Sequence, residues 1–265
     1  MTGIMQIDVK GKRVVVGGGS KGIGRSIALA FAQAGASVSI CAREAAALEN
    51  TRRELAAFGG VAHAATCDLA SETEIAAYMP AAAAALGGID VLVNNATGSG
   101  HADDEESWEK SLSVDLLAAV RASRAAMPFL RAGRGASIVN IASGSGLNPS
   151  VRAPAYGAAK AAVIHYTRTQ AAALVTSGIR VNCVAPGSIE FPGGVWDRRK
   201  RDQPALYKAT LAACPAGRMG TPEEVGRLCL FLACDATFTT GVDHIISGGA
   251  EIGYGRKPVG RSGDF

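Results

Sequence analysis

The feature that most constrains the fold of this chain is a regular alternation of two kinds of segment. Short apolar runs rich in β-branched residues alternate with Ala-rich stretches of helical length. The apolar runs are nearly continuous, which is typical of strands covered on both faces. Strands are predicted at 13–17, 37–41, 61–65, 89–93, 137–141, 179–184 and 242–246, with helices at about 22–34, 44–58, 71–86, 105–131, 155–177 and 221–234. This order predicts an α/β fold with a Rossmann-type, doubly wound sheet of about seven parallel strands.

Composition and charge exclude several other classes of protein. A chain of 265 residues that is 48% hydrophobic and 19% charged is neither disordered, nor collagen-like, nor a coiled coil. The net charge of +4 is too mild for a nucleic-acid surface. The basic run 198–201 is flanked by Asp197 and Asp202, so a solvated helix face is favoured over an anion-docking patch.

Three further patterns predict the location. The six cysteines have no paired spacing and are interpreted as reduced thiols. The N-terminal residues lack the pattern of a secretory signal, and no apolar run reaches 18 residues. We therefore expect a cytoplasmic protein without a membrane partner.

The loops after the strands are where function is expected, because ligands of open parallel sheets bind beyond the carboxyl ends of the strands. Residues 188–215 interrupt the alternation and are long for a plain connection, so we interpret them as a substrate lid. Its aromatic side chains would be Phe191, Trp196 and Tyr207, although ordinary packing explains the last two equally well. Residues 254–265 contain four Gly or Pro and are interpreted as a mobile or neighbour-docking tail.

A glycine-rich loop follows the first predicted strand and opens the first helix. In this position backbone N–H groups and the helix N-terminus are available to a pyrophosphate. Two registers fit, one through Gly17, Gly19 and Gly22 and the other through Gly18, Gly22 and Gly24. The predicted cofactor contacts in this loop are Gly18, Ser20, Lys21, Gly22, Ile23 and Gly24.

The residues after the second strand bear on the choice between NAD and NADP. A carboxylate there suits the ribose 2′-hydroxyl of NAD, whereas a basic residue suits the 2′-phosphate of NADP. Here the strand is followed by Arg43, and Lys21 could reach the same phosphate, so NADP(H) is favoured over NAD(H). Glu44 is the candidate for an NAD site, but we place it in the first turn of the next helix, where it complements the helix dipole.

Three residues form a candidate catalytic group. Ser143 follows the fifth strand, Tyr156 comes 13 residues later, and Lys160 is four residues beyond Tyr156. On a helix, Tyr156 and Lys160 lie one turn apart on the same face, where an ammonium favours the phenolate and makes the tyrosine an acid/base candidate. Ser143 could donate a hydrogen bond to a substrate oxygen. A Tyr-x-x-x-Lys spacing alone is usually a pair of surface residues. Its combination with Ser143 after the fifth strand is a more specific indication of a catalytic site.

On these motifs the sequence resembles the short-chain dehydrogenase/reductase family over essentially its whole length. The family's Asn-Asn-Ala-Gly and Asn-x-Val-x-Pro-Gly segments match Asn94-Asn95-Ala96 and 183–187, and Asp68-Leu69 stands where the family contacts adenine. The resemblance implies hydride transfer between a nicotinamide and a carbonyl or carbinol carbon. Tyr156 would move the proton and Lys160 would bind the nicotinamide ribose. The further cofactor contacts implied are Asp68, Leu69, Asn95, Ala96, Pro186, Gly187 and Ile189. The family is commonly tetrameric, so a homotetramer is expected.

The sequence departs from the family pattern at four positions. Gly17, Thr97 and Phe191 stand where the family usually has Thr, Gly and Thr, respectively. Asp115 stands in the place of the fourth catalytic residue, normally an Asn that organises a water relay to the lysine. An ionised Asp only accepts hydrogen bonds and would hold the ammonium of Lys160 more firmly. The alternative is that Asp115 lies too far from Lys160 and merely orders water.

Three functions remain open. The first is an NADP(H)-dependent reductase of a small-molecule ketone, resembling 3-oxoacyl-acyl-carrier-protein reductases. The second is an NAD-dependent dehydrogenase of an alcohol, sugar or steroid, and the third is a non-catalytic nucleotide-binding scaffold. The four histidines have no metal-ligand spacing, so no metal is assigned. Residues 1–265 are predicted to form a single dinucleotide-binding catalytic domain.

Overall fold

The seven predicted strands form one parallel sheet. The computed structural model describes residue 7, residues 9–98 and residues 100–251, so the predicted tail at 254–265 lies outside the described residues. The strands are β1 (Arg13–Gly17), β2 (Ser37–Ala42), β3 (Ala62–Thr66), β4 (Val91–Asn94), β5 (Ser137–Ile141), β6 (Arg180–Pro186) and β7 (Asp243–Ile246). Their order in the sheet, β3-β2-β1-β4-β5-β6-β7, confirms the doubly wound Rossmann-type prediction. The order reverses between β1 and β4, and that switch point is where such sheets bind ligands.

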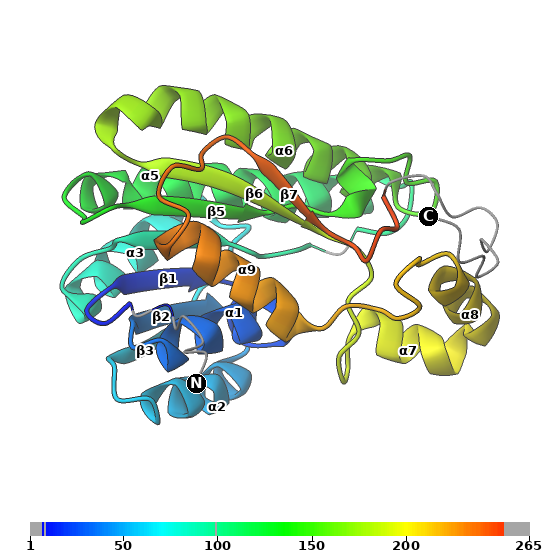
Figure 1. Ribbon diagram of the computed structural model, residues 1–265, viewed down its shortest axis with the longest axis horizontal. Helices are drawn as coiled ribbons and strands as arrows, with labels where there is room; N and C mark the ends of the chain where they lie inside the picture. The colour runs from blue at the N-terminus through cyan, green and yellow to red at the C-terminus, as the bar shows by residue number, and fades with distance from the viewer. Residues whose placement is uncertain (1–6, 8, 99, 252–265) are drawn as a thin grey trace, which may run out of the picture.

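Helices cover both faces of the sheet (Figure 1). One layer contains α1 (Gly22–Gln33), α2 (Ala45–Ala56) and α9 (Pro222–Cys234), and the other contains α3 (Glu72–Leu86), α5 (Ala118–Arg131) and α6 (Pro154–Leu174). Within β1, Val14 and Val16 belong to the core under the first layer, whereas Val15 belongs to the core under the second. Both sides of the strand are thus buried, which explains why its sequence is continuously apolar.

The predicted helix at 105–131 is not one α-helix. It consists of α4 (Glu105–Lys110), a π-helical segment η1 (Ser111–Leu117) and α5. A π-turn holds an additional residue and rotates the side chains that precede it relative to those that follow. The rotation turns Asp115 inward, where only 2% of its surface is exposed. Local sequence patterns predicted a helix but carried no signal for this interruption.

Residues 188–215 are not a plain loop either. They contain two short helices, α7 (Val195–Asp202) and α8 (Pro204–Ala212), which lie beside the sheet layers near the carboxyl ends of the strands (Figure 1). The predicted helix at 155–177 ends earlier than expected, at Leu174, and continues as the 3₁₀ turn η3 (Val175–Ser177) before Gly178. Between β5 and α6 lies a further 3₁₀ turn, η2 (Gly144–Gly146).

The amino edge of the sheet is held by a buried ion pair. Asp90 accepts hydrogen bonds from the backbone N–H, Nε and Nη2 of Arg13 at 3.0, 2.9 and 2.6 Å, and from the backbone N–H of Arg134 at 2.8 Å. Both carboxylate oxygens are therefore satisfied. Burial alone would raise the pKa of Asp90, but these hydrogen bonds from Arg13 and Arg134 lower it below its ordinary value.

Three sequence-based expectations concern the chain outside its motifs. All six cysteines are free thiols, and four of them are buried. No helix in the described part of the chain combines the length and apolar character needed to cross a membrane. Among the same residues, no cluster of three or more His, Cys, Asp or Glu side chains is arranged to hold a metal ion.

Candidate active site

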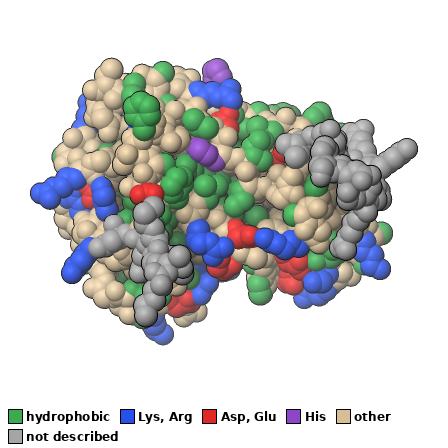
Figure 2. Space-filling view, viewed as in Figure 1, with side chains coloured by type: hydrophobic (Ala, Val, Ile, Leu, Met, Phe, Trp, Pro, Cys, Tyr) green, Lys and Arg blue, Asp and Glu red, His purple; other side chains and the backbone are tan. Residues whose placement is uncertain are grey.

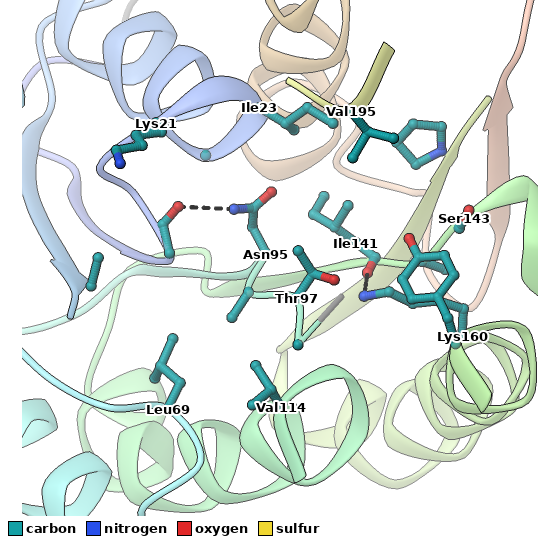
Figure 3. A pocket seen from close by; sticks show the side chains of 18 of the residues that line it. Lys21, Ile23, Leu69, Asn95, Thr97, Val114, Ile141, Ser143, Lys160 and Val195 are labelled. Atoms are coloured by element: carbon teal, nitrogen blue, oxygen red, sulfur yellow. Dashed lines mark hydrogen bonds between the residues drawn. The ribbon is translucent and has the colours of Figure 1, made fainter. Parts of the chain in front are cut away.

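A cavity of about 640 Å³ opens at the carboxyl edge of the sheet. It joins the glycine-rich loop to the Ser-Tyr-Lys group, so two motifs far apart in sequence share one space (Figure 3). The predicted residues that line it are Gly18, Lys21, Ile23, Gly24, Arg43, Asp68, Leu69, Asn95, Ala96, Ser143, Tyr156, Lys160, Pro186, Gly187, Ile189, Phe191 and Trp196. Four predicted residues do not line it: Ser20, Gly22, Asp115 and Tyr207.

The structure distinguishes between the two glycine registers. Gly18 has a φ of 71° and Gly22 a φ of 52°, a region that favours glycine. A Cβ atom on Gly24 would lie 2.1 Å from the carbonyl oxygen of Gly18, which is too close for any other residue. A Cβ on Gly17 would make only an ordinary contact, 3.5 Å from Leu69. All three positions of the Gly18, Gly22 and Gly24 register therefore require glycine. In the other register Gly19 also lacks room, because its Cβ would lie 2.5 Å from Ile40 Cγ2, but Gly17 could carry a side chain.

Asn95 connects the glycine loop to the end of β4. Its Nδ2 donates to the carbonyl oxygen of Gly18 at 3.1 Å, an interaction drawn in Figure 3. The side chain thereby fixes the loop against the neighbouring strand at the switch point of the sheet. The loop is held in shape by the chain itself before any ligand enters.

The adenosine end of the cavity differs in one respect from the expectation. Glu44 is the N-cap residue of α2 instead of a member of its first turn, and its side chain does not cap the helix. Instead, Glu44 Oε2 accepts from Lys21 Nζ at 2.7 Å, and this hydrogen bond lowers the pKa of Glu44. Lys21 is thus paired within the chain, while the exposed Arg43 lines the cavity beside it.

The three candidate catalytic side chains come from two adjacent segments. Ser143 follows β5 and accepts a hydrogen bond from the N–H of Ser145 at 3.2 Å, which leaves its own hydroxyl proton to donate. Tyr156 and Lys160 lie one turn apart near the start of α6, and the Lys160 ammonium is 5.6 Å from the centre of the Tyr156 ring. Lys160 is 2% exposed, and its Nζ donates to the carbonyl oxygen of Ile141 at 3.0 Å (Figure 3).

Asp115 is the direct neighbour of Lys160. Its Oδ1 lies 3.1 Å from the ammonium, and its Oδ2 accepts from the backbone N–H of Gly98 at 3.1 Å. Oδ1 has no well-directed hydrogen bond, so its contact with Lys160 is an ion pair. Burial is the largest influence on the pKa of Lys160 and lowers it, but Asp115, Tyr156 and Cys183 together outweigh burial, so that pKa is raised. The distance excludes the alternative that Asp115 is too remote to act on the lysine.

The three predicted lid residues have different surroundings in the structure. Phe191 packs on the glycine loop, because a Cβ on Gly22 would lie 2.4 Å from its ring. Trp196 lines the cavity from α7. The hydroxyl of Tyr207 donates to Glu190 Oε2 at 2.7 Å, so this side chain bonds within the segment and stays out of the cavity lining.

Sequence reasoning missed several residues of the site. Thr97, Val114 and Val195 line the cavity (Figure 3), and His101 packs edge-on against Tyr156 with ring centres 6.0 Å apart. Val114 could have been inferred, because it precedes Asp115. His101 lies in an irregular segment between β4 and α4, where no periodicity exists to indicate the direction of a side chain.

The residues present fit a nicotinamide dinucleotide. The cavity is within the volume range of small-molecule and cofactor sites, and the glycine loop offers backbone N–H groups at the N-terminus of α1. Side chains at Gly18, Gly22 and Gly24 would collide with the loop or its neighbours, so the backbone surface at this end is kept bare. Such a surface admits the close approach of a pyrophosphate.

Comparison with known proteins identifies the family. The family model described as enoyl-(acyl carrier protein) reductase matches residues 18–251. The chain belongs to the short-chain dehydrogenase/reductase family. It is an oxidoreductase of the kind that acts on CH–OH groups, and the resemblance inferred from its motifs is confirmed.

Three relatives illustrate the range of this family. The chain is 36% identical to an L-fucose dehydrogenase of Bos taurus, with 93% of this chain and 92% of that protein covered. It is 38% identical to a 2-keto-3-deoxy-L-fuconate dehydrogenase of Xanthomonas campestris pv. campestris, with 91% and 80% covered. The crystal structure of L-sorbose reductase from Gluconobacter frateurii, complexed with NADPH and L-sorbose, superimposes with a TM-score of 0.84 at 32% identity, covering 93% and 99%.

Proposed function

We propose that this protein transfers hydride between NADP(H) and the carbonyl or secondary alcohol carbon of a small molecule. The observation that carries the proposal is the position of Lys160, whose ammonium is held between Ile141 and Asp115 and beside the Tyr156 ring. A bound nicotinamide would supply or accept the hydride. The tasks of this chain are then to orient the reactants and to move one proton.

Each catalytic side chain has one task in this proposal. Tyr156 gives its phenolic proton to the substrate oxygen during reduction and takes it back during oxidation. Ser143 donates a hydrogen bond from its hydroxyl to the same oxygen as negative charge develops there, and keeps its proton. The ammonium of Lys160 lies 5.6 Å from the centre of the Tyr156 ring and has N–H groups to donate to a nicotinamide ribose. Asp115 keeps the ammonium in place.

NADP(H) is proposed over NAD(H) because Arg43 lines the adenosine end of the cavity. The pairing of Lys21 with Glu44 limits its share in binding a 2′-phosphate. We expect Arg43→Ala to lower the ratio of kcat/KM for NADPH over NADH by about tenfold, the loss of one charge-assisted contact. Arg53→Ala is a matched control, because Arg53 is an exposed arginine that pairs with Glu49 on α2. Glu44→Gln should raise the same ratio by releasing Lys21. An unchanged ratio in Arg43→Ala would contradict the assignment.

The substrate class follows from the relatives only at a coarse level. Two are named for the sugars L-fucose and L-sorbose and one for a sugar-derived acid. We propose a hydroxylated small molecule of this kind as the first candidate. A 3-oxoacyl thioester is the second, favoured by the enoyl-reductase description of the matching family model. A panel of sugars, sugar acids, ketones and 3-oxoacyl thioesters, run with NADPH and NADH and followed by reduced-nicotinamide absorbance, tests both. NADPH binding without turnover anywhere in the panel would favour a scaffold.

We also propose a homotetramer in the cytoplasm. Small residues on the predicted helix at 105–131 would allow close approach of a second chain, but three of these alanines, Ala118, Ala122 and Ala126, belong to the core of the chain itself. A different surface is the better candidate for an interface between chains. Figure 2 shows hydrophobic side chains gathered over α9 and β7, where Phe231, Val242 and Ile245 are 43%, 43% and 49% exposed. Light scattering at micromolar concentration should give four times the chain mass, and Ile245→Glu should reduce it. A monomer mass in the unchanged protein would contradict the proposal.

A further inference from the structure

The basic run on α7 contains one arginine unlike its neighbours. Three of the four side chains have oxygen partners in the chain: Arg198 at Gly193, Lys200 at Glu190 and Arg201 at Asp197. Arg199 has no carboxylate or carbonyl partner among the described residues. Its guanidinium instead lies 4.9 Å over the ring of Trp196. The solvated helix face expected for this run therefore describes three of its residues but not Arg199.

The surroundings of Arg199 leave its charge uncompensated. The side chain is half-buried, and its charged neighbours are Arg152 and Arg198, both positive. Burial lowers the pKa of Arg199, and these two positive charges lower it further. A desolvated cation next to like charges is unfavourable unless an anion joins it. Stacking on Trp196 offsets part of this cost but supplies no negative charge.

Arg199 lies beside the cavity. It is not one of the residues that line it, but Trp196, which its guanidinium covers, lines the same cavity as Ser143 and Tyr156. His101 packs on Tyr156, and its pKa is lowered by burial and then by the charge of Arg199, which agrees with that placement. Glu251 approaches the neighbouring Ser143 loop at Gly144, but its carboxylate accepts from Asn148.

We propose that Arg199 binds a carboxylate group of the substrate. The substrates would be hydroxy acids and oxo acids whose carbinol or carbonyl group lies at Tyr156 and Ser143. A guanidinium matches a carboxylate with two parallel hydrogen bonds, and the Trp196 ring holds its plane in one orientation. This inference rests on the proposed function, because it assigns a substrate class to the same site.

The first test uses matched substrates that differ only in charge. Short oxo acids, with two to four bonds between carbonyl and carboxyl carbons, are compared with their primary amides by kcat/KM. The unchanged enzyme should prefer the acid at least tenfold, about 1.4 kcal/mol. Arg199→Gln should abolish this preference through a higher KM for the acid, with little change for the amide. Arg201→Gln, which removes the same charge from the same helix, should keep it. Equal efficiency with acid and amide, or a preference that survives Arg199→Gln, would overturn the inference.

The second test measures binding without turnover. The chain has two tryptophans, so Trp108→Phe leaves Trp196 as its only one. Its fluorescence is titrated with each oxo acid in the presence of saturating NADP⁺ at constant ionic strength. A saturable change should occur in this background and with Arg201→Gln, and should disappear with Arg199→Gln. A saturable response that persists without Arg199, or no response to any acid, refutes the anion site. Absence of turnover with every neutral and acidic compound would refute the proposed function separately, because the titration does not depend on catalysis.

Discussion

Two buried carboxylates, Asp90 and Asp115, lie at opposite edges of the sheet and are built differently. Asp90, at the amino edge, has both oxygens bonded to Arg13 and Arg134. Asp115, at the carboxyl edge, accepts one backbone N–H, and its other oxygen meets the Lys160 ammonium without a well-directed hydrogen bond. A fully bonded pair stabilises the fold. In a pair that lacks some of its hydrogen bonds, the cation keeps N–H groups and charge available to a neighbouring side chain or ligand.

The positions of the two pairs suggest why they differ. Loops at the carboxyl edge form the cavity, so a side chain there must serve a ligand as well as the fold. Loops at the amino edge line no part of that cavity, and Arg13 is free to satisfy Asp90 completely. We therefore expect substitutions at the carboxyl edge to change catalysis and those at the amino edge to change stability.

The largest expected effect is the loss of turnover in Tyr156→Phe. The substitution removes the proposed proton donor and keeps the ring, so kcat should fall by about 10² to 10⁴, the usual contribution of an acid/base group. The dissociation constant for NADPH, measured by fluorescence titration, should change little. Turnover near that of the unchanged enzyme would mean that another group transfers the proton. The carboxyl edge would then not have the catalytic role that the comparison with the amino edge assigns to it.

The next effect is expected at the amino edge. Asp90→Ala leaves the Arg13 guanidinium and two backbone N–H groups without their acceptor. It should lower the free energy of unfolding by about 2 to 4 kcal/mol, because a buried pair is broken from one side. Urea unfolding measures this, with Glu106→Gln in an exposed pair as the control. The kcat of the folded variant should be unchanged. A fall in kcat comparable with that of Tyr156→Phe would show that the amino edge also serves catalysis.

The same residue predicts a pH dependence of stability. The folded pKa of Asp90 is lowered, so its contribution is complete above the unfolded value of about 3.9 and is lost as pH falls through the folded value. Asp90→Asn should therefore flatten the loss of stability below about pH 4. Thermal unfolding of both proteins between pH 3 and 7 tests this. Parallel curves would show that the carboxylate charge contributes nothing.

The smallest expected effect is a shift of the pH profile in Asp115→Asn. Asp115 pairs with the Lys160 ammonium, which lies beside the Tyr156 ring, so Asp115→Asn leaves a positive charge without its counter-ion next to that ring. The substitution should preserve folding and turnover and move the alkaline midpoint of the oxidation profile down by about one pH unit, since one unit corresponds to a modest charge interaction. An unchanged midpoint would show that Asp115 acts on structure alone, as Asp90 does.

Much of this site could be predicted from the sequence because its motifs depend on local patterns. Apolar runs located the strands, and parallel strands bring the residues that follow them to one edge, so Ser143 and Asn95 were expected at the same edge of the sheet. Helical spacing placed Tyr156 beside Lys160. Two glycine registers remained open, since only the packed backbone shows that Gly24 lies against Gly18.

Other features were decided by tertiary structure alone. The sequence contained Asp115 as a departure from the family pattern, but its position 3.1 Å from Lys160 depends on the π-helical segment η1, which packs on α6, and on the hydrogen bond from Gly98. Nothing in the sequence distinguishes the four consecutive basic residues 198–201 from one another. Their difference arises from the way residues 190–201 fold, which places Arg199 over Trp196 while Arg198 and Lys200 reach acceptors at Gly193 and Glu190. The local sequence pattern determines on which helix, strand or loop a side chain stands. The burial of that side chain and the charged groups around it are set by the segments that pack against it.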